Sequence, residues 1–457
     1  MTTIHDEPAD TPADRIFLGL TLLASLVQGL FGIAKYGYCG QDFGYHYAIL
    51  RTFPAGFTYA YTNPPGVYAL GYLVASVISK RFVLEGTAFV LLVVNVSSLW
   101  LLYGLVRRII TSRPIRWAAM LLATFVPFRV VHSIVYSGDA VTIPIFLIVV
   151  RQAIAMLDED SMPIRRWVII GASATIGMLF KYTFAGLLPP LALLAIHQFR
   201  TSGRDRGHRG VAVAGVICLL VPSSTFLVQM RLSSRANGTT VVSQWLAPGE
   251  PIQMTVADLV LLKRADREIL KAPQFFQDEL WQPHKYSYLA LLHLATFTDV
   301  LNYLQEKPRL SAHWDVHMRD SDDLPRARAA TIWSPIAVVG ALPVTAAALL
   351  GALWFLVASL AWLAGQRGRA VMPLAVLCLL ACGFYAPLVL NITKVKCPYS
   401  CGYWLPRLAM PSLLSFLILG FVTVDRAIAA LPRGRGICAR SCLVYTAILC
   451  VVFIVIT

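Results

Sequence analysis

The chain has 457 residues, of which 57% are hydrophobic and only 14% are charged, and its mean hydropathy is +0.65. These values exclude a soluble multidomain protein and indicate a polytopic membrane protein. The net charge of +15 comes with no basic domain or recognised nucleic-acid motif, so a nucleic-acid-binding function is excluded as well.

The apolar runs predict an all-α fold with about eleven or twelve transmembrane helices, since none alternates as a barrel strand would. We expect a disordered cytoplasmic tail at 1–14, a catalytic membrane module at 15–230, a long outer loop at 231–332 and C-terminal membrane helices at 333–457. The first span, 15–34, is too long for a typical signal peptide. The later spans are predicted at 89–106, 117–135, 141–156, 167–180, 184–196, 211–229, 336–364, 370–390, 405–424 and 443–456.

The first outer loop, 35–66, follows directly on the first span and contains Asp42, His46 and six tyrosines. Tyrosine is typical of the boundary between water and lipid. A carboxylate at that depth is costly unless it is paired, metal-bound or solvated from one side, so Asp42 is a functional candidate. The alternative for Asp42 is a solvated loop acid.

The connecting loops fall into two alternating sets. One set carries clusters of arginine, and the positive-inside rule places it in the cytoplasm; it comprises 107–116, 165–166, 200–209, 367–369 and 426–440. The other set includes the loops around Asp139 and Lys181, together with 231–332 and 391–404. All of these share the outer face with Asp42 if the short apolar stretch 67–79 does not cross, so we interpret 67–79 as an interfacial or re-entrant helix.

Two amphipathic helices are predicted in the long outer loop, at 256–270 and 286–305. The second carries His293 and Asp299, which we interpret as structural. In the loop at 391–404, Cys397 and Cys401 are a plausible short-loop disulfide if the loop is extracytoplasmic.

Polar candidates gather on the predicted outer face. Carboxylates with a histidine can hold a divalent metal, and cations with a tyrosine can hold a phosphate. Within one helix, His132 and Asp139 would be two turns apart on nearly the same side. The candidates are Asp42, His46, Arg129, His132, Asp139, Lys181, Tyr182, Lys394, Lys396 and Arg407.

The order of several motifs resembles the GT-C superfamily of integral membrane glycosyltransferases, especially the aminoarabinose-transferase-like and protein-O-mannosyltransferase-like members. An acid follows the first helix at Asp42, and an aromatic loop ends in the sequence Asn-Pro-Pro-Gly-Val-Tyr at 63–68. Then come Ser-Gly-Asp-Ala at 137–140, Lys-Tyr-Thr-Phe-Ala-Gly at 181–186, and Tyr-Trp-Leu-Pro-Arg-Leu-Ala-Met-Pro at 403–411.

The resemblance implies transfer of a sugar from a polyprenyl-phosphate donor to a lipid, glycan or protein acceptor on the outer face. Carried over by position, Asp42 is the general base and Asp139 the second-loop acid, while Lys181 and Arg407 are expected to bind the donor phosphate. Arg129 lies near these motifs without matching one of them and is a further candidate for binding the donor phosphate. A divalent metal, Mg²⁺ or Mn²⁺, held by Asp42 and Asp139 is left open. Asp139 alternatively caps a helix, and Lys181 alternatively anchors a span by snorkelling.

Two other functional classes are weighed against this enzyme. The first is a transporter or flippase of a lipid-linked or anionic substrate, although the sequence shows no pair of related halves. The second is a non-catalytic subunit of a membrane assembly. The short tails favour a multi-pass protein of the bacterial inner membrane with its active site facing outward, in contact with membrane lipids.

Overall fold

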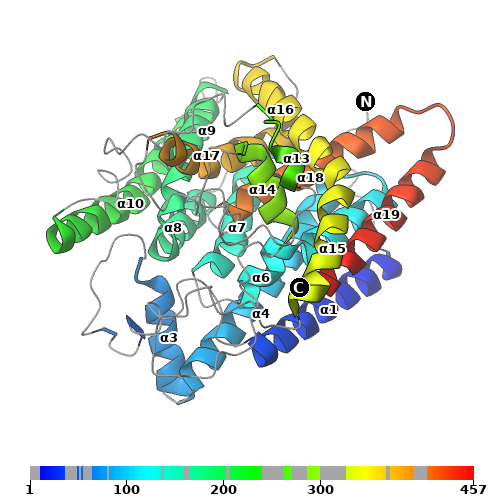
Figure 1. The fold of residues 1–457 in the computed structure, drawn as a ribbon. Helices are drawn as coiled ribbons and strands as arrows, with labels where there is room; N and C mark the ends of the chain where they lie inside the picture. Colours follow the sequence, from blue (N-terminus) through cyan, green and yellow to red (C-terminus); the bar gives the residue numbers. More distant parts are fainter. Residues whose placement is uncertain are drawn as a thin grey trace.

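A computed structural model describes residues 11–36, 49–50, 53–54, 64–79, 82–134, 138–158, 164–201, 206–238, 261–269, 286–298, 326–366, 371–394 and 409–457. Every regular element within these ranges is helical (Figure 1), which confirms the predicted all-α class. The first half contains α1 (Pro12–Tyr36), α3 (Gly66–Val77), α4 (Val83–Ile109), α5 (Arg113–Phe125), α6 (Pro127–Ile134), α7 (Asp139–Asp158), α8 (Ile164–Phe180), η2 (Tyr182–Leu187), α9 (Leu188–Thr201) and α10 (Arg206–Asn237). The second half contains α13 (Asp266–Ile269), α14 (Tyr288–Phe297), α15 (Arg326–Gly340), α16 (Leu342–Leu363), α17 (Met372–Lys394), α18 (Met410–Ala429) and α19 (Arg435–Ile456).

Nine of the described helical segments are long and apolar enough to cross a membrane, and a tenth is counted if the bent pair α5 and α6 forms one span. The predicted span at 167–180, which corresponds to α8, is not among these ten. With 17 residues this helix is about 26 Å long, at the lower limit for a crossing helix. The chain is therefore a multi-pass integral membrane protein.

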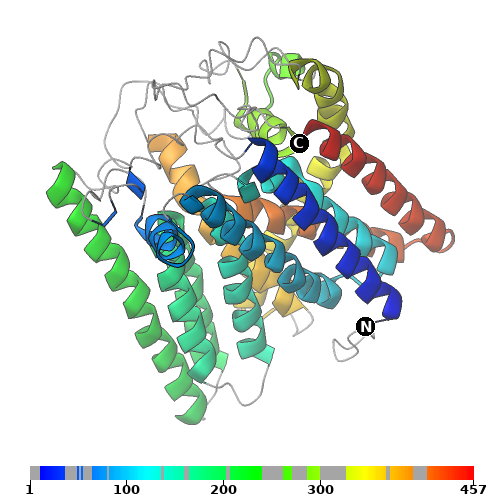
Figure 2. The ribbon, with the colours of Figure 1, turned by 90° about the horizontal axis from the view of Figure 1, so that it is seen from below.

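The short helix α3 covers most of the stretch predicted to be interfacial or re-entrant. Its 12 residues give a length of about 18 Å, well short of the hydrocarbon thickness of about 30 Å. In Figure 2, α3 is seen nearly end-on while α8 and α10 run along the page, so α3 lies across the direction of these longer helices. A short helix with this orientation cannot be one of the spans.

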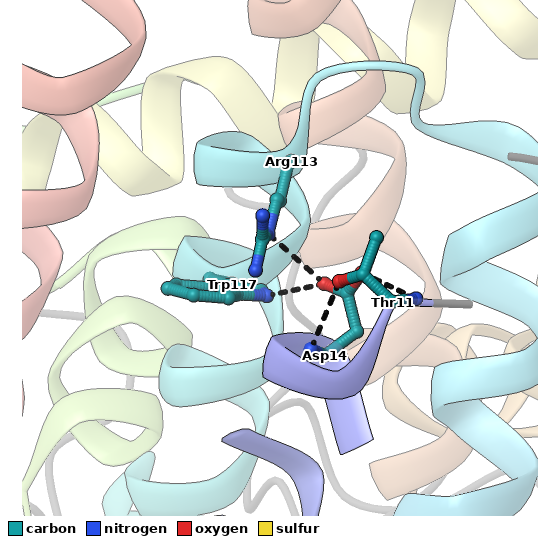
Figure 3. A network of polar contacts seen from close by, with 4 residues as sticks. All are labelled: Thr11, Asp14, Arg113 and Trp117. Carbon is teal, nitrogen blue, oxygen red and sulfur yellow. Dashed lines mark hydrogen bonds and ion pairs between the residues drawn. The ribbon is translucent and has the colours of Figure 1, made fainter. Parts of the chain in front are cut away.

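One end of the bundle gathers segments that the sequence analysis placed in the cytoplasm. Asp14 lies in the first turn of α1, and its carboxylate accepts hydrogen bonds from the Thr11 hydroxyl (2.6 Å) and the Trp117 indole (2.9 Å). The Arg113 guanidinium lies 3.3 Å from the same carboxylate (Figure 3). Residues 12–14 thus belong to α1, so the predicted disordered tail at 1–14 is wrong for its last residues. Thr11 and Asp14 form a reciprocal capping box that starts the helix.

A second contact joins the loop between α4 and α5 to the residue just before 426–440, another segment that is predicted to be cytoplasmic. Asp425, in the last turns of α18, accepts hydrogen bonds from the backbone N–H groups of Thr111 (2.9 Å) and Ser112 (3.1 Å) between α4 and α5. The opposite end of the bundle carries α13, α14 and the C-terminal ends of α1 and α10, which lie toward the top of Figure 2 while the N-terminus lies below. Segments from the two predicted sets therefore lie at different ends of the bundle.

The helix predicted at 256–270 is wrong for most of the residues of this segment that the structure describes, 261–269. Residues 261–265 form bends and turns, and only Asp266–Ile269 is helical. The Asp266 carboxylate accepts from the backbone N–H of Lys263 (2.6 Å) and of Ser287 (2.8 Å), so it joins two loops and does not continue a helix. The helical spacing of apolar residues in this segment did not predict its structure, because the hydrogen bond between Asp266 and the distant Ser287 backbone favours a turn.

The predicted helix at 286–305 is shorter and more deeply placed than expected. α14 ends at Phe297, and its residues are buried on more than one side instead of along a single stripe. His293 bridges the Thr345 hydroxyl (2.7 Å) and the carbonyl of Val338 (2.9 Å), as its structural interpretation predicts. Burial lowers the pKa of His293, with the bond to the Val338 carbonyl opposing that shift. Asp299 lies outside the described residues.

Candidate functional site

The centre of the site is an ion pair between two residues singled out in the sequence. Asp139 is the first residue of α7, and Lys181 lies between the end of α8 and η2. The Lys181 ammonium binds the Oδ1 atom of Asp139, and the two side chains are 17% and 2% exposed. The pair therefore joins the two loops, and Lys181 keeps access from one side.

Two glycines allow this convergence. A Cβ atom at Gly138 would lie 2.6 Å from the carbonyl oxygen of Phe180, and one at Gly66 would lie 2.5 Å from the carbonyl oxygen of Leu179. Real Cβ contacts are essentially never this short, so only glycine permits the backbone to approach. The starts of α3 and α7 thus pack directly on the last turn of α8, beside Lys181.

The six-residue motif that begins at Lys181 packs as η2 against α17. A Cβ atom at Gly186 would lie 2.2 Å from the carbonyl oxygen of Gly383, and one at Gly383 would lie 2.6 Å from the carbonyl of Gly186. Tyr182 is buried and packs with Met230 from α10. Both neighbouring helices therefore hold η2, and with it the position of Lys181.

A buried polar chain supports the start of α7 from within the bundle. The Asn95 side chain, from α4, donates to the carbonyl of Ala140 (3.3 Å), next to Asp139. The carbonyl of Asn95 in turn accepts from Nη2 of Arg129 (3.3 Å). Asn95 was missed in the sequence, where a lone asparagine inside the apolar run 89–106 was the available signal.

Arg129 lies inside the bundle with 1% of its surface exposed. Pro127 has no N–H, and α5 and α6 meet there at 44°, so carbonyls of the preceding turn lose their usual helical donors. Nη1 of Arg129 donates to the carbonyl of Thr124 (2.8 Å) and to the hydroxyl of Ser25 on α1 (3.3 Å). Together with the bond to the Asn95 carbonyl, these bonds join the helix break to α1 and α4.

The remaining candidates are not brought together by described contacts. His132 is 4% exposed on α6, which ends at Ile134, whereas Asp139 begins α7, so the spacing of two turns within one helix does not apply to this pair. Lys394 is the last residue of α17, and its side chain lies outside the described part of the chain. The candidates outside the described residues are Asp42, His46, Lys396, Arg407, Cys397 and Cys401.

The described residues contain no group of three histidine, cysteine or acidic side chains arranged to hold a metal. Of the two acids expected as ligands, Asp139 already has its charge balanced by Lys181, and Asp42 is outside the described ranges. A Mg²⁺ or Mn²⁺ requirement stays a prediction.

Residues 62–227 match the family model of dolichyl-phosphate-mannose-protein mannosyltransferase. This region is less than half of the chain and includes the aromatic loop motif, Asp139 and Lys181. Over these residues the match confirms the predicted resemblance to the GT-C membrane glycosyltransferases. No curated protein gives a significant sequence match to the chain.

Similar solved structures include the archaeal oligosaccharyltransferase AglB from Archaeoglobus fulgidus, in complex with an inhibitory peptide and a dolichol-phosphate. It shares 14% identity at a TM-score of 0.46, and the match covers 96% of this chain and 56% of AglB. The chain thus spans little more than half the length of AglB. ArnT from Cupriavidus metallidurans, bound to undecaprenyl phosphate, shares 16% identity at a TM-score of 0.41, with 90% and 78% covered.

Proposed function

We propose that the chain transfers a glycosyl group from a polyprenyl-phosphate-linked sugar to a lipid, glycan or protein acceptor at the outer, extracytoplasmic face of the membrane. The observation that carries this proposal is the packing of three motif segments around the end of α8, with the Asp139–Lys181 pair at their meeting point. A largely buried ion pair at the end of a membrane helix is costly to build and is a functional candidate by default.

Lys181 is the proposed ligand of the donor phosphate. An ammonium group has three N–H donors, and Asp139 accepts from it, so Lys181 has further donors for a phosphate oxygen. Asp139 then acts as a positioning residue that holds the ammonium toward the exposed side. Arg407 is the proposed second cation.

Asp42 is the proposed general base. The acceptor oxygen attacks the anomeric carbon, the bond between that carbon and the donor's phosphate oxygen breaks, and Asp42 takes the proton of the acceptor hydroxyl. The polyprenyl phosphate leaves as an anion, and the cations stabilise the charge that develops on it. This chain's residues thus account for both the proton and the leaving group.

The outward orientation is supported by the separation of loops at the two ends of the bundle. Asp425, next to the arginine-rich segment 426–440, accepts from the backbone of Thr111 in the arginine-rich segment 107–116. The Asp139–Lys181 pair belongs to the other predicted set. With arginine-rich loops in the cytoplasm, the pair faces outward. The proposed location is the bacterial inner membrane.

The test is transfer of radiolabelled sugar from polyprenyl-phosphate donors by the purified full chain, with added Mg²⁺, Mn²⁺ or chelator. A base contributes about 10²- to 10⁴-fold, so D42N is expected to lose that much while still binding donor. K181M should lose donor binding. The matched control is R166Q, at the other end of α8, where Arg166 donates to Gln152 (2.8 Å); it should retain transfer.

Two outcomes of this experiment would change the proposal. Equal transfer by wild type and D42N would remove Asp42 as the base. A folded wild type that binds polyprenyl phosphate but transfers no sugar from any donor would favour the transporter or flippase, which is then tested by translocation of the same lipid across proteoliposomes.

A further inference from the structure

Gln229 in α10 carries a buried carboxamide that finds no partner among the described residues. The residue is 2% exposed, and within the described part of the chain neither its Nε2 nor its Oε1 atom has a hydrogen-bond partner. Leaving such a group unsatisfied is unfavourable, more so in a helix that qualifies as a membrane span. A buried polar group in this state calls for an explanation outside the packing of the protein.

The helical position of Gln229 places it beside the proposed site. Phe226 and Met230 of α10 pack with Tyr182, the residue that follows Lys181. Gln229 is three positions after Phe226 and lies on the same side of the helix. The hydroxyl of Thr183, the next residue in η2, is also buried, at 9% exposure, and has no hydrogen-bond partner in the part of the chain that the structure describes.

We propose that Gln229, together with Thr183, forms a subsite for the hydroxyl groups of the donor's sugar. This inference rests on the proposed function, because it takes Lys181 as the ligand of the donor phosphate. The glycosyl group is bonded directly to that phosphate and so lies within a few ångströms of Lys181. The polyprenyl chain has no polar atoms and cannot satisfy an amide.

The chemistry of the two side chains fits a sugar. A carboxamide presents N–H donors and a carbonyl acceptor side by side, and a sugar hydroxyl both donates and accepts. Neighbouring hydroxyls can therefore satisfy both ends of Gln229 at once. Binding requires the apolar cover over these atoms to shift, and Met230, which packs at this point, is unbranched and adapts readily.

The experiment compares two ligands with the purified full chain: undecaprenyl phosphate, which has no sugar, and undecaprenyl phosphate linked to mannose, glucose or arabinose. The variant is Q229M, which keeps the volume of the side chain and removes its polar atoms. We expect Q229M to bind undecaprenyl phosphate like wild type and the preferred sugar-linked donor about 5- to 10-fold more weakly, the equivalent of one net hydrogen bond. K181M should weaken both ligands by the same factor.

The matched control is Q198M. Gln198 is also fully buried, but its Oε1 atom accepts from the Trp167 indole (3.1 Å), so Q198M should lower thermal stability without changing the preference between the ligands. Q229M should be at least as stable as wild type, since it removes two unsatisfied atoms.

Unchanged affinity of Q229M for every sugar-linked donor would overturn the subsite and leave the proposed function standing. Failure of wild type to bind either kind of ligand would overturn the proposed function, and the subsite with it. A loss of both ligands in Q229M would assign Gln229 to packing and also overturn the subsite.

Discussion

The ion pair of Asp139 and Lys181 can be tested by a double-mutant cycle of D139N, K181M and the double variant. Removing one partner of a buried pair leaves an uncompensated charge and costs about 3–5 kcal/mol. K181M strands a carboxylate that is 2% exposed, whereas D139N strands an ammonium that is 17% exposed and can extend toward water. K181M should therefore be the more destabilised single variant.

The double variant carries no stranded charge. It should be less destabilised than the sum of the single variants, with a coupling of about 1–3 kcal/mol between the two sites. The assay is unfolding of the purified chain in a constant detergent, with R166Q as a control for loss of a cation at the other end of α8. Additive losses, or equal losses in K181M and D139N, would refute the reasoning.

The same variants separate structure from chemistry. If Lys181 binds the donor phosphate, the double variant regains stability but not sugar transfer. Transfer restored together with stability would show that the charge of Lys181 has no part in donor binding.

Three further predictions follow from the described contacts. G138A should destabilise the chain by about 2 kcal/mol or more in a thermal scan, as overpacking does, because its Cβ would meet the Phe180 carbonyl. The control is G104A, whose Cβ meets nothing within 4 Å and which should be neutral or stabilising in the same scan. R129M should lower stability more than R129K does, because a lysine ammonium can still donate to the carbonyls of Thr124 and Asn95, whereas methionine leaves these buried acceptors without that donor. Normal stability of R129M with loss of polyprenyl-phosphate binding would instead assign Arg129 to the donor. Burial lowers the pKa of His293 below its usual 6.5. The stability that the neutral imidazole contributes is therefore complete above pH 6.5 and is lost as the pH falls below it. H293Q should flatten the dependence of unfolding stability on pH between about pH 7 and pH 5, and an unchanged dependence would contradict this role of His293.

Much of the membrane topology could be predicted from sequence because a span is a local property. About twenty apolar residues bury their own backbone hydrogen bonds as a helix whatever their neighbours are. The predicted runs at 89–106 and 141–156 correspond in this way to α4 and α7. The run 117–135 also lies in helices, but the bend at Pro127 divides it into α5 and α6.

Prediction was weaker where a tertiary contact competes with local periodicity. The segment 256–270 has helical spacing, yet Asp266 accepts from the distant Ser287 backbone, and 261–265 turns instead. Arg129 has the charge of a phosphate ligand, but its guanidinium donates to the Thr124 carbonyl at the helix break and to the hydroxyl of Ser25 on α1.

The sequence by itself determined the membrane class, the helical fold and the set of motifs that carry the family resemblance, because each depends on composition and spacing along the chain. Only the tertiary structure decided that Asp139 meets Lys181, that Gly66 and Gly138 make room for that meeting, and that Gln229 has no partner among the described residues. Pairing between side chains depends on which helices become neighbours and how closely their backbones approach, and these quantities arise only when the whole bundle packs.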